Sequence, residues 1–467
     1  MDIFLSSLPI LSTVFALWLG ARSLHAALLG VGAAALAAVL AFPIPGESIE
    51  PAALRWAPIL MEVLLIVAGG LLLSEVLRHA GGQAALAKWI GEHAGQGVGA
   101  VLLVVHGITP FAESLTGFGI GVTIGIPLLA HFGLPARTVA VIGLLGLCAV
   151  PWGSMGPGTL IAATMSDLPS HDLGLVSAII SVIPFIATGI VAAWLASPTG
   201  GRGMAVLQGV LSGIVLAVSI AVMNAAFGTP PAGALGALVV IALHVLHGNR
   251  QRCAAPLENV GRKALWSYAV LLGGILIAGL TVHTAGMSEN WRYLASPALW
   301  LFVAALWFAR GLPEKQPMRR AWASWQQVAP VTGLFITLGI VMAVSGMAAF
   351  LAQTLAGAGT VYLAAAPFVG AIGGFVTGSN SGANAMFAAT QAEIARSLGV
   401  DVLWFMAIHN VAAAFLLMAS PGKIEMAVQL SPAGAAEHRR WIQMTMLRVT
   451  FTVVVLLAVL NVILSFF

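Results

Sequence analysis

Long apolar runs alternate with short segments rich in proline, glycine or charge along the 467 residues of the chain. A helix needs about 20 predominantly apolar residues to cross the hydrocarbon core of a bilayer. Runs of this length and their flanking breaks predict an all-α polytopic membrane protein with about twelve transmembrane helices. The expected crossings are 3–20, 24–42, 56–77, 136–165, 173–197, 204–227, 231–247, 264–284, 295–310, 327–349, 401–431 and 443–466.

Two further pairs of apolar runs are predicted to be re-entrant hairpins rather than crossings. Each arm has about 15 residues and, at about 1.5 Å per residue, reaches about 22 Å, short of the roughly 30 Å core. The polar tips, 113–117 and 377–384, would then lie at membrane depth, where irregular backbone survives only if protein buries it or if it lines a cavity. The paired arms are 97–112 with 118–131, and 361–376 with 385–397.

Each hairpin is followed by a crossing that is itself interrupted, at 151–158 in the first case and at 420–423 in the second. The two units match in layout, because Ser154 and Ser420 are 266 residues apart, as are Gly156 and Gly422. The charges of the flanking loops predict that the two units cross the membrane in opposite directions. Inverted repeats with broken helices are typical of secondary transporters that bind substrate near the midplane. Two glycine-rich channel or packing helices are the alternative interpretation.

This layout predicts a transport unit that moves against a scaffold. The expected divisions are 1–96 for N-terminal scaffold helices with an interfacial helix at 80–95, 97–172 for the first hairpin and broken helix, 173–356 for further scaffold helices, 357–432 for the second hairpin and broken helix, and 433–467 for a C-terminal helix.

Composition excludes most other classes of protein. Charged residues make up 8% of the chain and hydrophobic residues 60%, against about 25% charged residues in soluble domains. Soluble enzymes and nucleic-acid binders are therefore excluded, and the net charge of +4 comes from basic residues scattered through loops. The two cysteines, Cys148 and Cys253, form no pattern typical of a disulfide or metal framework, so no metal and no cofactor are expected.

The distribution of basic residues predicts the orientation in the membrane. If the N-terminus faces outward, most of the 20 Lys and Arg residues fall in inside loops, including Arg250 and Arg252. Because basic loops stay on the cytoplasmic side, both termini are expected outside.

Helix ends at the tips and breaks leave backbone groups unpaired, and these attract anions at N-termini and cations at C-termini. Small polar side chains beside them are candidates for substrate binding, although the same groups serve equally to cap broken helices. The candidate set is Ser114, Thr116, Gly117, Ser154, Ser379, Asn380, Ser381, Asn384, Ser420 and Lys423.

Four ionisable side chains have alternative interpretations. Glu113 lies at the first tip, where membrane depth penalises its charge; it is a candidate proton carrier or a structural carboxylate paired with Lys423. Lys423 is positioned either to hold a substrate carboxylate or to neutralise Glu425 or Glu113. His409, followed by Asn410, is either a proton relay or half of a hydrogen-bonded core pair. Glu62 is also predicted to lie within the membrane. Because it is far in sequence from both units, a role at an interface or in the scaffold is as good an interpretation as a role in transport.

Several motifs resemble those of the lactate permease family. Residues 113–119 read Glu-Ser-Leu-Thr-Gly-Phe-Gly, 132–135 read Phe-Gly-Leu-Pro, and 152–157 read Trp-Gly-Ser-Met-Gly-Pro. They are similar to a Glu-Gly-x-x-Gly-Phe-Gly stretch, a Gly-Phe-x-Pro turn and a Phe-Gly-x-x-Gly-x-Pro stretch of that family. The segment 374–387, Gln391 and 418–423 are similar to its Thr-Gly-Ser-Asp-Thr-x-x-Asn-x-Leu-Phe, Gln and Met-Ile-Ser-Pro-Gln-Ser patterns. The match covers about 97–165 and 357–430.

The resemblance implies a bacterial inner-membrane, proton-coupled symporter for 2-hydroxy monocarboxylates such as lactate and glycolate. It also implies kinship with the ion-transporter superfamily, whose members move two hairpins and two broken helices against a scaffold. Three positions depart from the family pattern. Asn380 replaces an aspartate, Gly422 a glutamine and Lys423 a serine, so one acid is lost and one cation gained near the expected site.

The leading hypothesis is thus proton symport of a small organic anion by a multi-pass protein of the lipid bilayer, with no nucleic-acid partner and dimerisation expected through scaffold helices. A sodium-coupled carboxylate symporter is the alternative, because Ser379, Asn380 and Ser381 resemble the Ser-Asn-Thr tips of divalent-anion sodium symporters. A channel is more remote, since the polar residues gather in two patches rather than one stripe. An intramembrane enzyme would need a nucleophile–base pair or a metal-ligand set, and the spacing offers none.

Overall fold

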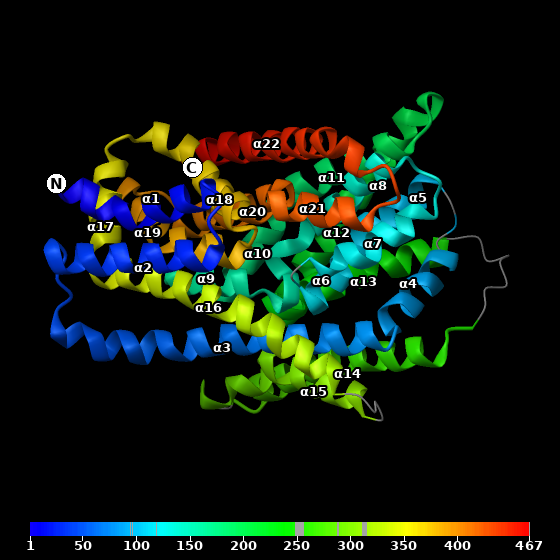
Figure 1. The fold of residues 1–467 in the computed structure, drawn as a ribbon, viewed down its shortest axis with the longest axis horizontal. Helices are drawn as coiled ribbons and strands as arrows, with labels where there is room; N and C mark the ends of the chain where they lie inside the picture. The colour runs from blue at the N-terminus through cyan, green and yellow to red at the C-terminus, as the bar shows by residue number, and fades with distance from the viewer. Residues whose placement is uncertain are drawn as a thin grey trace.

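The structure, a computed structural model, describes residues 1–466 except 94, 96, 118, 248–255, 287, 288 and 311–314. Cys253, Arg250 and Arg252 lie outside the described residues. The described part of the chain is built from helices and contains no strand, which confirms the predicted all-α class (Figure 1).

The helices lie in three successive stretches of the chain, 2–196, 199–247 and 259–464. The first comprises α1 (Asp2–Trp18), α2 (Ser23–Leu40), α3 (Gly46–His79), α4 (Gly82–His93), α5 (Val98–Leu103), the π-helical η1 (Val104–Ile108), α6 (Thr109–Thr116), α7 (Ile120–Ala130), α8 (Ala136–Leu145), η2 (Gly146–Met155), α9 (Pro157–Met165), α10 (Ser170–Ile180) and α11 (Val182–Ala196). After the short η3 (Thr199–Gly201) come α12 (Arg202–Phe227) and α13 (Thr229–His247). The third comprises α14 (Asn259–Thr284), η4 (Glu289–Ala295), α15 (Pro297–Ala309), α16 (Gln316–Val344), α17 (Met347–Ala356), α18 (Thr360–Thr377), α19 (Asn380–Leu398), α20 (Val402–Leu416), η5 (Leu417–Ala419), α21 (Pro421–Leu430), η6 (Ala436–His438) and α22 (Arg439–Leu464).

Among the described residues, twelve helices are long and apolar enough to cross a membrane, which confirms a multi-pass membrane protein. They differ from the expected twelve at four places. The hairpin arms Val98–Thr116 and Thr360–Thr377 qualify, with 19 and 18 residues, whereas Asp2–Trp18 and Pro297–Ala309 are shorter than 18 residues.

The second hairpin turn is tighter than its sequence predicts. The polar stretch 377–384 was expected to form the tip, but only Gly378 and Ser379 lie between α18 and α19. The Ser379 hydroxyl accepts a hydrogen bond from the Gly382 amide, so it caps α19 and allows the following polar residues to be helical. The arms are therefore longer than the expected 15 residues.

The 266-residue correspondence extends well beyond the hairpins. Shifted by 266, the starts of α3, α4 and α8 fall at 312, 348 and 402, close to the starts of α16, α17 and α20. In Figure 1, α3 runs from left to right and α16 from right to left. The packing follows the same correspondence, because α15 packs on α3 as α16 packs on α2.

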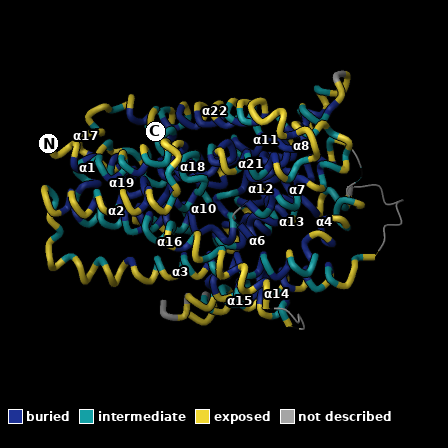
Figure 2. The backbone as a smooth tube through the Cα atoms, viewed as in Figure 1, coloured by how far each residue is buried: buried dark blue, intermediate teal, exposed yellow. Residues whose placement is uncertain are grey.

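Most buried hydrophobic residues of the described chain fall in two clusters. The smaller core joins α3, α14 and α15 and also takes in Leu115 of α6, Met155 of η2 and Ala234 of α13, whereas the larger core includes α1, α2, the hairpins, the broken helices and α10 to α13. Helix α11 packs closely on α12, because a Cβ added at Gly189 would come within 2.2 Å of the Gly209 carbonyl oxygen. The buried backbone gathers around α6, α10, α12 and α13 (Figure 2). By packing, α10 to α12 and most of α13 share the larger core with the hairpins.

Candidate functional site

A cavity of about 130 Å³, here called the central cavity, lies where both hairpin tips meet both helix breaks. Its size suits a small solute, since a cavity of roughly 150 Å³ holds benzene, which has six non-hydrogen atoms like lactate. The lining residues come from α6, η2, the start of α9, the tip of the second hairpin, η5 and the start of α21. They are Glu113, Val150, Gly153, Ser154, Pro157, Gly158, Gly378, Ser379, Asn380, Ser381, Leu417 and Lys423.

Glu113, near the end of α6, turns its carboxylate to the start of the next helix. Its Oε1 accepts from the Gly119 amide at 2.9 Å and its Oε2 from the Gly121 amide at 3.1 Å, so it caps α7. Gly119 has a φ of 85°, a left-handed conformation in which glycine carries no steric penalty. Two N–H donors at a helix N-terminus stabilise a negative charge, which offsets part of the cost of burying this side chain at 4% exposure.

Lys423 is the cation of the central cavity. It lies in the first turn of α21, and a Cβ added at Gly119 would come within 2.7 Å of its Nζ. The charge of Glu113 acts on it, but within the described ranges Lys423 makes neither a hydrogen bond nor an ion pair with a side chain. Glu425 does not neutralise it, because Glu425 pairs with Arg439 at 2.7 Å. The ammonium donors of Lys423 therefore remain available to a bound anion.

Ser154 occupies a strained turn that closes one side of the central cavity. It has a φ of 43°, and Met155 follows with a φ of 63°, both in the left-handed region that non-glycine residues rarely adopt. The Ser154 hydroxyl is buried without a hydrogen-bond partner in the described part of the chain. It lies against Gly70 of α3, whose added Cβ would come within 2.3 Å of the hydroxyl oxygen. A strained residue with an unpaired polar group is a candidate ligand contact.

Ser154→Ala is expected to separate binding from stability. In the free protein the hydroxyl makes no hydrogen bond, so its removal should leave the melting temperature unchanged. If the hydroxyl bonds the substrate in a desolvated site, binding should weaken by about 1–3 kcal/mol. Calorimetric titration with lactate and a thermal unfolding scan of the same preparation test both parts. Unchanged affinity would exclude Ser154 from the site.

The second hairpin contributes Asn380 to the cavity and also to a buried network behind it. The Asn380 amide donates to Asn410 Oδ1 at 3.1 Å, and the Asn384 amide donates to the same oxygen at 2.9 Å. Asn410 in turn donates to the hydroxyls of Thr159 on α9 and Ser177 on α10. The network thus ties the second hairpin to the first broken helix and to α10, with Asn410 as the buried residue that joins them.

The structure brings together Glu113, Ser154, Ser379, Asn380, Ser381 and Lys423 from the predicted set. The Ser420 hydroxyl lies beside this group, 3.5 Å from the position of a Cβ added at Gly378. Ser420 is the N-cap residue of α21, but its hydroxyl makes no capping hydrogen bond and has no partner among the described residues.

Five other predicted residues do not line the central cavity. Ser114 faces Gly233 of α13, and the Thr116 hydroxyl donates to the Ala112 carbonyl of its own helix. Gly117 packs against the Ser154 side chain, where a Cβ would come within 2.4 Å. Asn384 belongs to the buried network, and its side chain is fully buried. His409 packs on Gly370, and neither ring nitrogen has a hydrogen-bond partner in the described part of the chain.

Sequence reasoning missed the apolar and backbone parts of the site. Val150 and Leu417 line the cavity, yet they look like any other apolar residue of a crossing. Gly153, Pro157 and Gly158 carried a signal, because they form the break, but not one that marked them as lining residues. No group of three or more His, Cys, Asp or Glu that suits a metal ion occurs among the described residues.

Comparison with known proteins finds one matching family and several relatives. The chain matches the family described as L-lactate permease over residues 2–253 and 274–466. It is 23% identical over 350 residues to the L-lactate permease of Streptococcus iniae, covering 66% of this chain and 73% of that protein. It is 35% identical over 95 residues to the L-lactate permease of Escherichia coli K12, covering 20% of this chain and 17% of that one.

A further relative and a solved structure complete the comparison. The glycolate permease GlcA of E. coli K12 is 33% identical over 95 residues, covering 20% of this chain and 17% of that protein. The crystal structure of the YdaH transporter of Alcanivorax borkumensis matches with a TM-score of 0.49 and 16% identity, covering 86% of this chain and 84% of that one.

Proposed function

Because the chain belongs to the L-lactate permease family, as its motifs indicated, we propose that it moves small 2-hydroxy monocarboxylates such as lactate and glycolate together with protons. It is a membrane permease and not an enzyme. The observation that carries the proposal is Lys423, a cation with no hydrogen-bond or ion-pair partner in the described part of the chain, in a central cavity of about 130 Å³ that the carboxylate of Glu113 also lines.

The substrate carboxylate pairs with Lys423, because a partly desolvated charge pair is stronger than the same pair in water. The N-terminus of α21 adds to this attraction, since helix N-termini favour anions. The hydroxyl on the second carbon is small and polar, and the Ser154 hydroxyl and the Asn380 and Ser381 side chains lie within the same cavity to bond it. Asn380 and Lys423 stand where the family pattern has an aspartate and a serine, so this site is more positive and better suited to an anion.

Glu113 carries the proton. Among the described residues it is the only carboxylate that lines the central cavity, and its charge acts on Lys423. An incoming carboxylate competes with Glu113 for the same ammonium, so its binding favours protonation of Glu113. By linkage, protonation of Glu113 favours substrate binding to the same extent, which gives positive coupling between proton and substrate.

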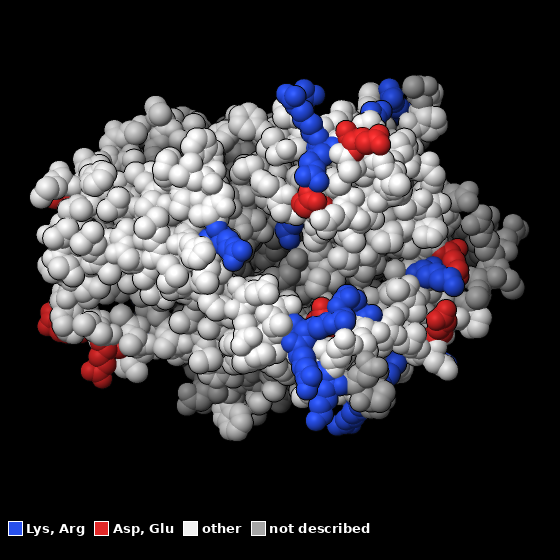
Figure 3. Space-filling view, in the orientation of Figure 1, with Lys and Arg blue, Asp and Glu red and all other residues white. Residues whose placement is uncertain are grey.

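The cavity opens on the side of α21. Pro421 and Gly422 at the second break are exposed, whereas Pro151 and Trp152 at the first break are buried. In Figure 3 most Lys and Arg side chains of this face lie in the right half, and the left end shows acidic side chains. We assign the basic side to the cytoplasm by the positive-inside rule, which puts both termini outside, makes this an inward-open state and fits a bacterial inner membrane.

Movement of the hairpins and broken helices against the smaller core supplies alternating access. The larger core carries the central cavity and the smaller core joins α3, α14 and α15, so the contact between them is the surface along which an elevator motion takes place. Dimerisation through the helices of the smaller core is part of the same proposal.

Uptake of labelled lactate into proteoliposomes tests the proposal. An inward proton gradient should drive accumulation, and a sodium gradient at equal pH should not. The alternative, sodium coupling, is supported by the amide and hydroxyl oxygens of Asn380, Asn384, Asn410 and Thr159, the ligand type that hard cations prefer. Several of these oxygens already accept from amide donors, which favours the proton. Accumulation driven by a sodium gradient alone would favour sodium coupling over proton coupling.

A further inference from the structure

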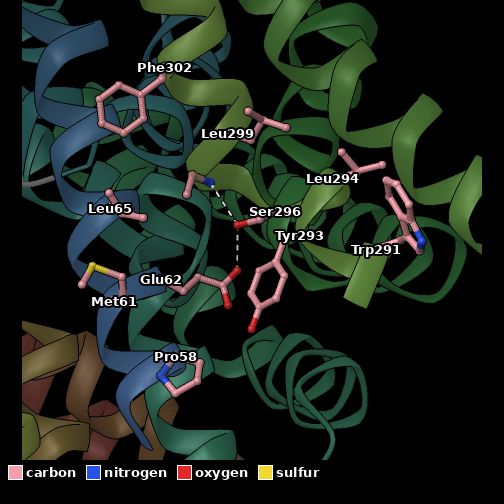
Figure 4. A pocket seen from close by; sticks show the side chains of 11 residues that line it. Pro58, Met61, Glu62, Leu65, Trp291, Tyr293, Leu294, Ser296, Leu299 and Phe302 are labelled. Carbon is pink, nitrogen blue, oxygen red and sulfur yellow. Dashed lines mark hydrogen bonds between the residues drawn. The ribbon is translucent and has the colours of Figure 1, made fainter. Parts of the chain in front are cut away.

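Two more cavities lie between α3 and its neighbours, on the far side of the first helix break. One, of about 350 Å³, is called here the lateral cavity; it extends from the start of α10 at Ser170 to the break at Met155 and Gly156. The other, of about 660 Å³, is mainly apolar and lies between α3, η4 and α15 (Figure 4). Glu62 and Ser296 line both.

Glu62 stands at the junction of these two cavities. The Ser296 hydroxyl donates to its Oε1 at 2.7 Å, and Figure 4 shows the Tyr293 ring beside the carboxylate. Among the residues whose side chains the structure describes, Glu62 is the only charged one that lines either cavity.

Few charged groups lie near this part of α3 among the described residues. On α3 itself, Arg55 is seven residues earlier and pairs with Asp167 at 2.8 Å. Helices α9 and α15 and the segment η2 carry no Asp, Glu, Lys or Arg. In sequence, the titratable residues of the other elements around α3 are Glu289, Arg292 and Tyr293 of η4, Glu113 of α6, Lys88, Glu92 and His93 of α4, and Arg319 and Arg320 of α16.

The lateral and central cavities are separated by a single strained turn. Gly153 and Ser154 line the central cavity, and the next two residues, Met155 and Gly156, line the lateral one. Ser154, Met155 and Gly156 all have positive φ angles. Since the central cavity opens on the side of α21, the lateral cavity approaches the site from the opposite side.

The acidic group belongs to one repeat only. Shifted by 266, position 62 corresponds to Val328 in α16, so the equivalent place on the other approach carries no charge. Alternating access uses the two repeats in turn, and a group present in one repeat acts on one approach. Glu62 therefore has no charged counterpart in the second repeat.

We propose that the lateral cavity is the outer approach to the site and that Glu62 is its entrance residue, which admits the organic anion when the carboxylate is protonated. This proposal rests on the proposed function. A charged Glu62 repels an anion in a narrow, mostly apolar passage. Like charges about 12 Å apart at an effective dielectric of about 20 repel by about 1.4 kcal/mol, which is a tenfold effect. Protonated Glu62 removes the repulsion and adds a hydrogen-bond donor.

Glu62→Gln tests the proposal in proteoliposomes of known orientation. At neutral outside pH the variant should show a KM for outside lactate about tenfold lower than the wild type, and at acidic pH the two should agree. The KM for efflux from the side of α21 should not change. The steady-state accumulation ratio of the variant should equal that of the wild type, because Glu62 does not carry the transported proton. Glu50→Gln, an exposed glutamate on the same helix, is the matched control and should match the wild type throughout.

Cysteine labelling tests the cavity without transport. Thr164 lines the lateral cavity and is half-buried, whereas Ala162 on the same helix is fully buried. In a Cys-free background, Thr164→Cys should react with a membrane-impermeant thiol reagent from outside and Ala162→Cys should not. Absence of labelling at 164, or equal KM values for Glu62→Gln and wild type at neutral pH, would overturn this proposal alone. Absence of any lactate uptake by the wild type would instead defeat the proposed function.

Discussion

Lys423→Met should weaken lactate binding by about 2–4 kcal/mol, roughly 30- to 700-fold. Within the described ranges, the ammonium is the only cation that lines the central cavity, and no carboxylate forms an ion pair with it. Methionine keeps the length of the side chain but removes the charge, so a bound carboxylate would be desolvated without a partner. Calorimetric titration of the purified protein measures the loss.

Two variants control for other effects of the Lys423 change. Lys423→Arg keeps the charge and should retain part of the affinity, although its larger head fits the site less well. Lys88→Met removes an exposed cation far from the cavity and should leave binding unchanged. Wild-type affinity in Lys423→Met would show that the substrate carboxylate binds elsewhere and that Lys423 serves only to balance Glu113.

Glu113→Gln should abolish accumulation driven by a proton gradient while exchange of lactate across the membrane persists. The variant mimics the protonated state in shape, and it can neither take up nor release a proton. Measuring accumulation and counterflow in the same proteoliposomes separates the two activities, because counterflow needs no proton coupling.

The hydrogen bonds of Glu113 add a second expected effect of this variant. Both carboxylate oxygens accept from backbone amides, at Gly119 and Gly121. The NH₂ group of glutamine cannot accept, so one amide loses its partner at a cost of about 1–3 kcal/mol. A lower melting temperature together with intact counterflow would therefore agree with the proposal. If Glu113→Gln still concentrates lactate with unchanged pH dependence, Glu113 is structural and acts only as the cap of α7.

Hydropathy predicted the fold class because each helix that crosses a bilayer needs a long run of apolar residues, which is visible in the sequence. Stretches of about 20 apolar residues cannot stay in water, and the chain offers twelve candidates. The expected crossings and the candidate helices differ at four places, because length and composition alone do not separate a short crossing such as Pro297–Ala309 from a hairpin arm such as Thr360–Thr377. The sequence does not state how far a helix continues into a polar tip. At the second tip, the hydrogen bond from the Gly382 amide to the Ser379 hydroxyl sets the start of α19.

The helix breaks were readable for the same local reason. Glycine and proline at 151–158 and 420–423 disrupt helical hydrogen bonding wherever they lie, so the positions of both breaks followed from sequence. The 266-residue correspondence was visible at these breaks, but its extension to α3 with α16 and α4 with α17 was not, because lipid-facing helices share hydropathy and no particular residues.

What the tertiary structure decided was which polar groups meet. Asn380 and Asn384 lie one helical turn apart and look equivalent in sequence, yet Asn380 reaches the cavity whereas Asn384 is fully buried behind it. Lys423 had two acidic candidates for a partner, and the pairing of Glu425 with Arg439 removed one of them. Capping and ligand binding use the same side chains. Their roles are therefore fixed by contacts between segments more than 200 residues apart, such as Asn384 with Gly158, and not by the local pattern.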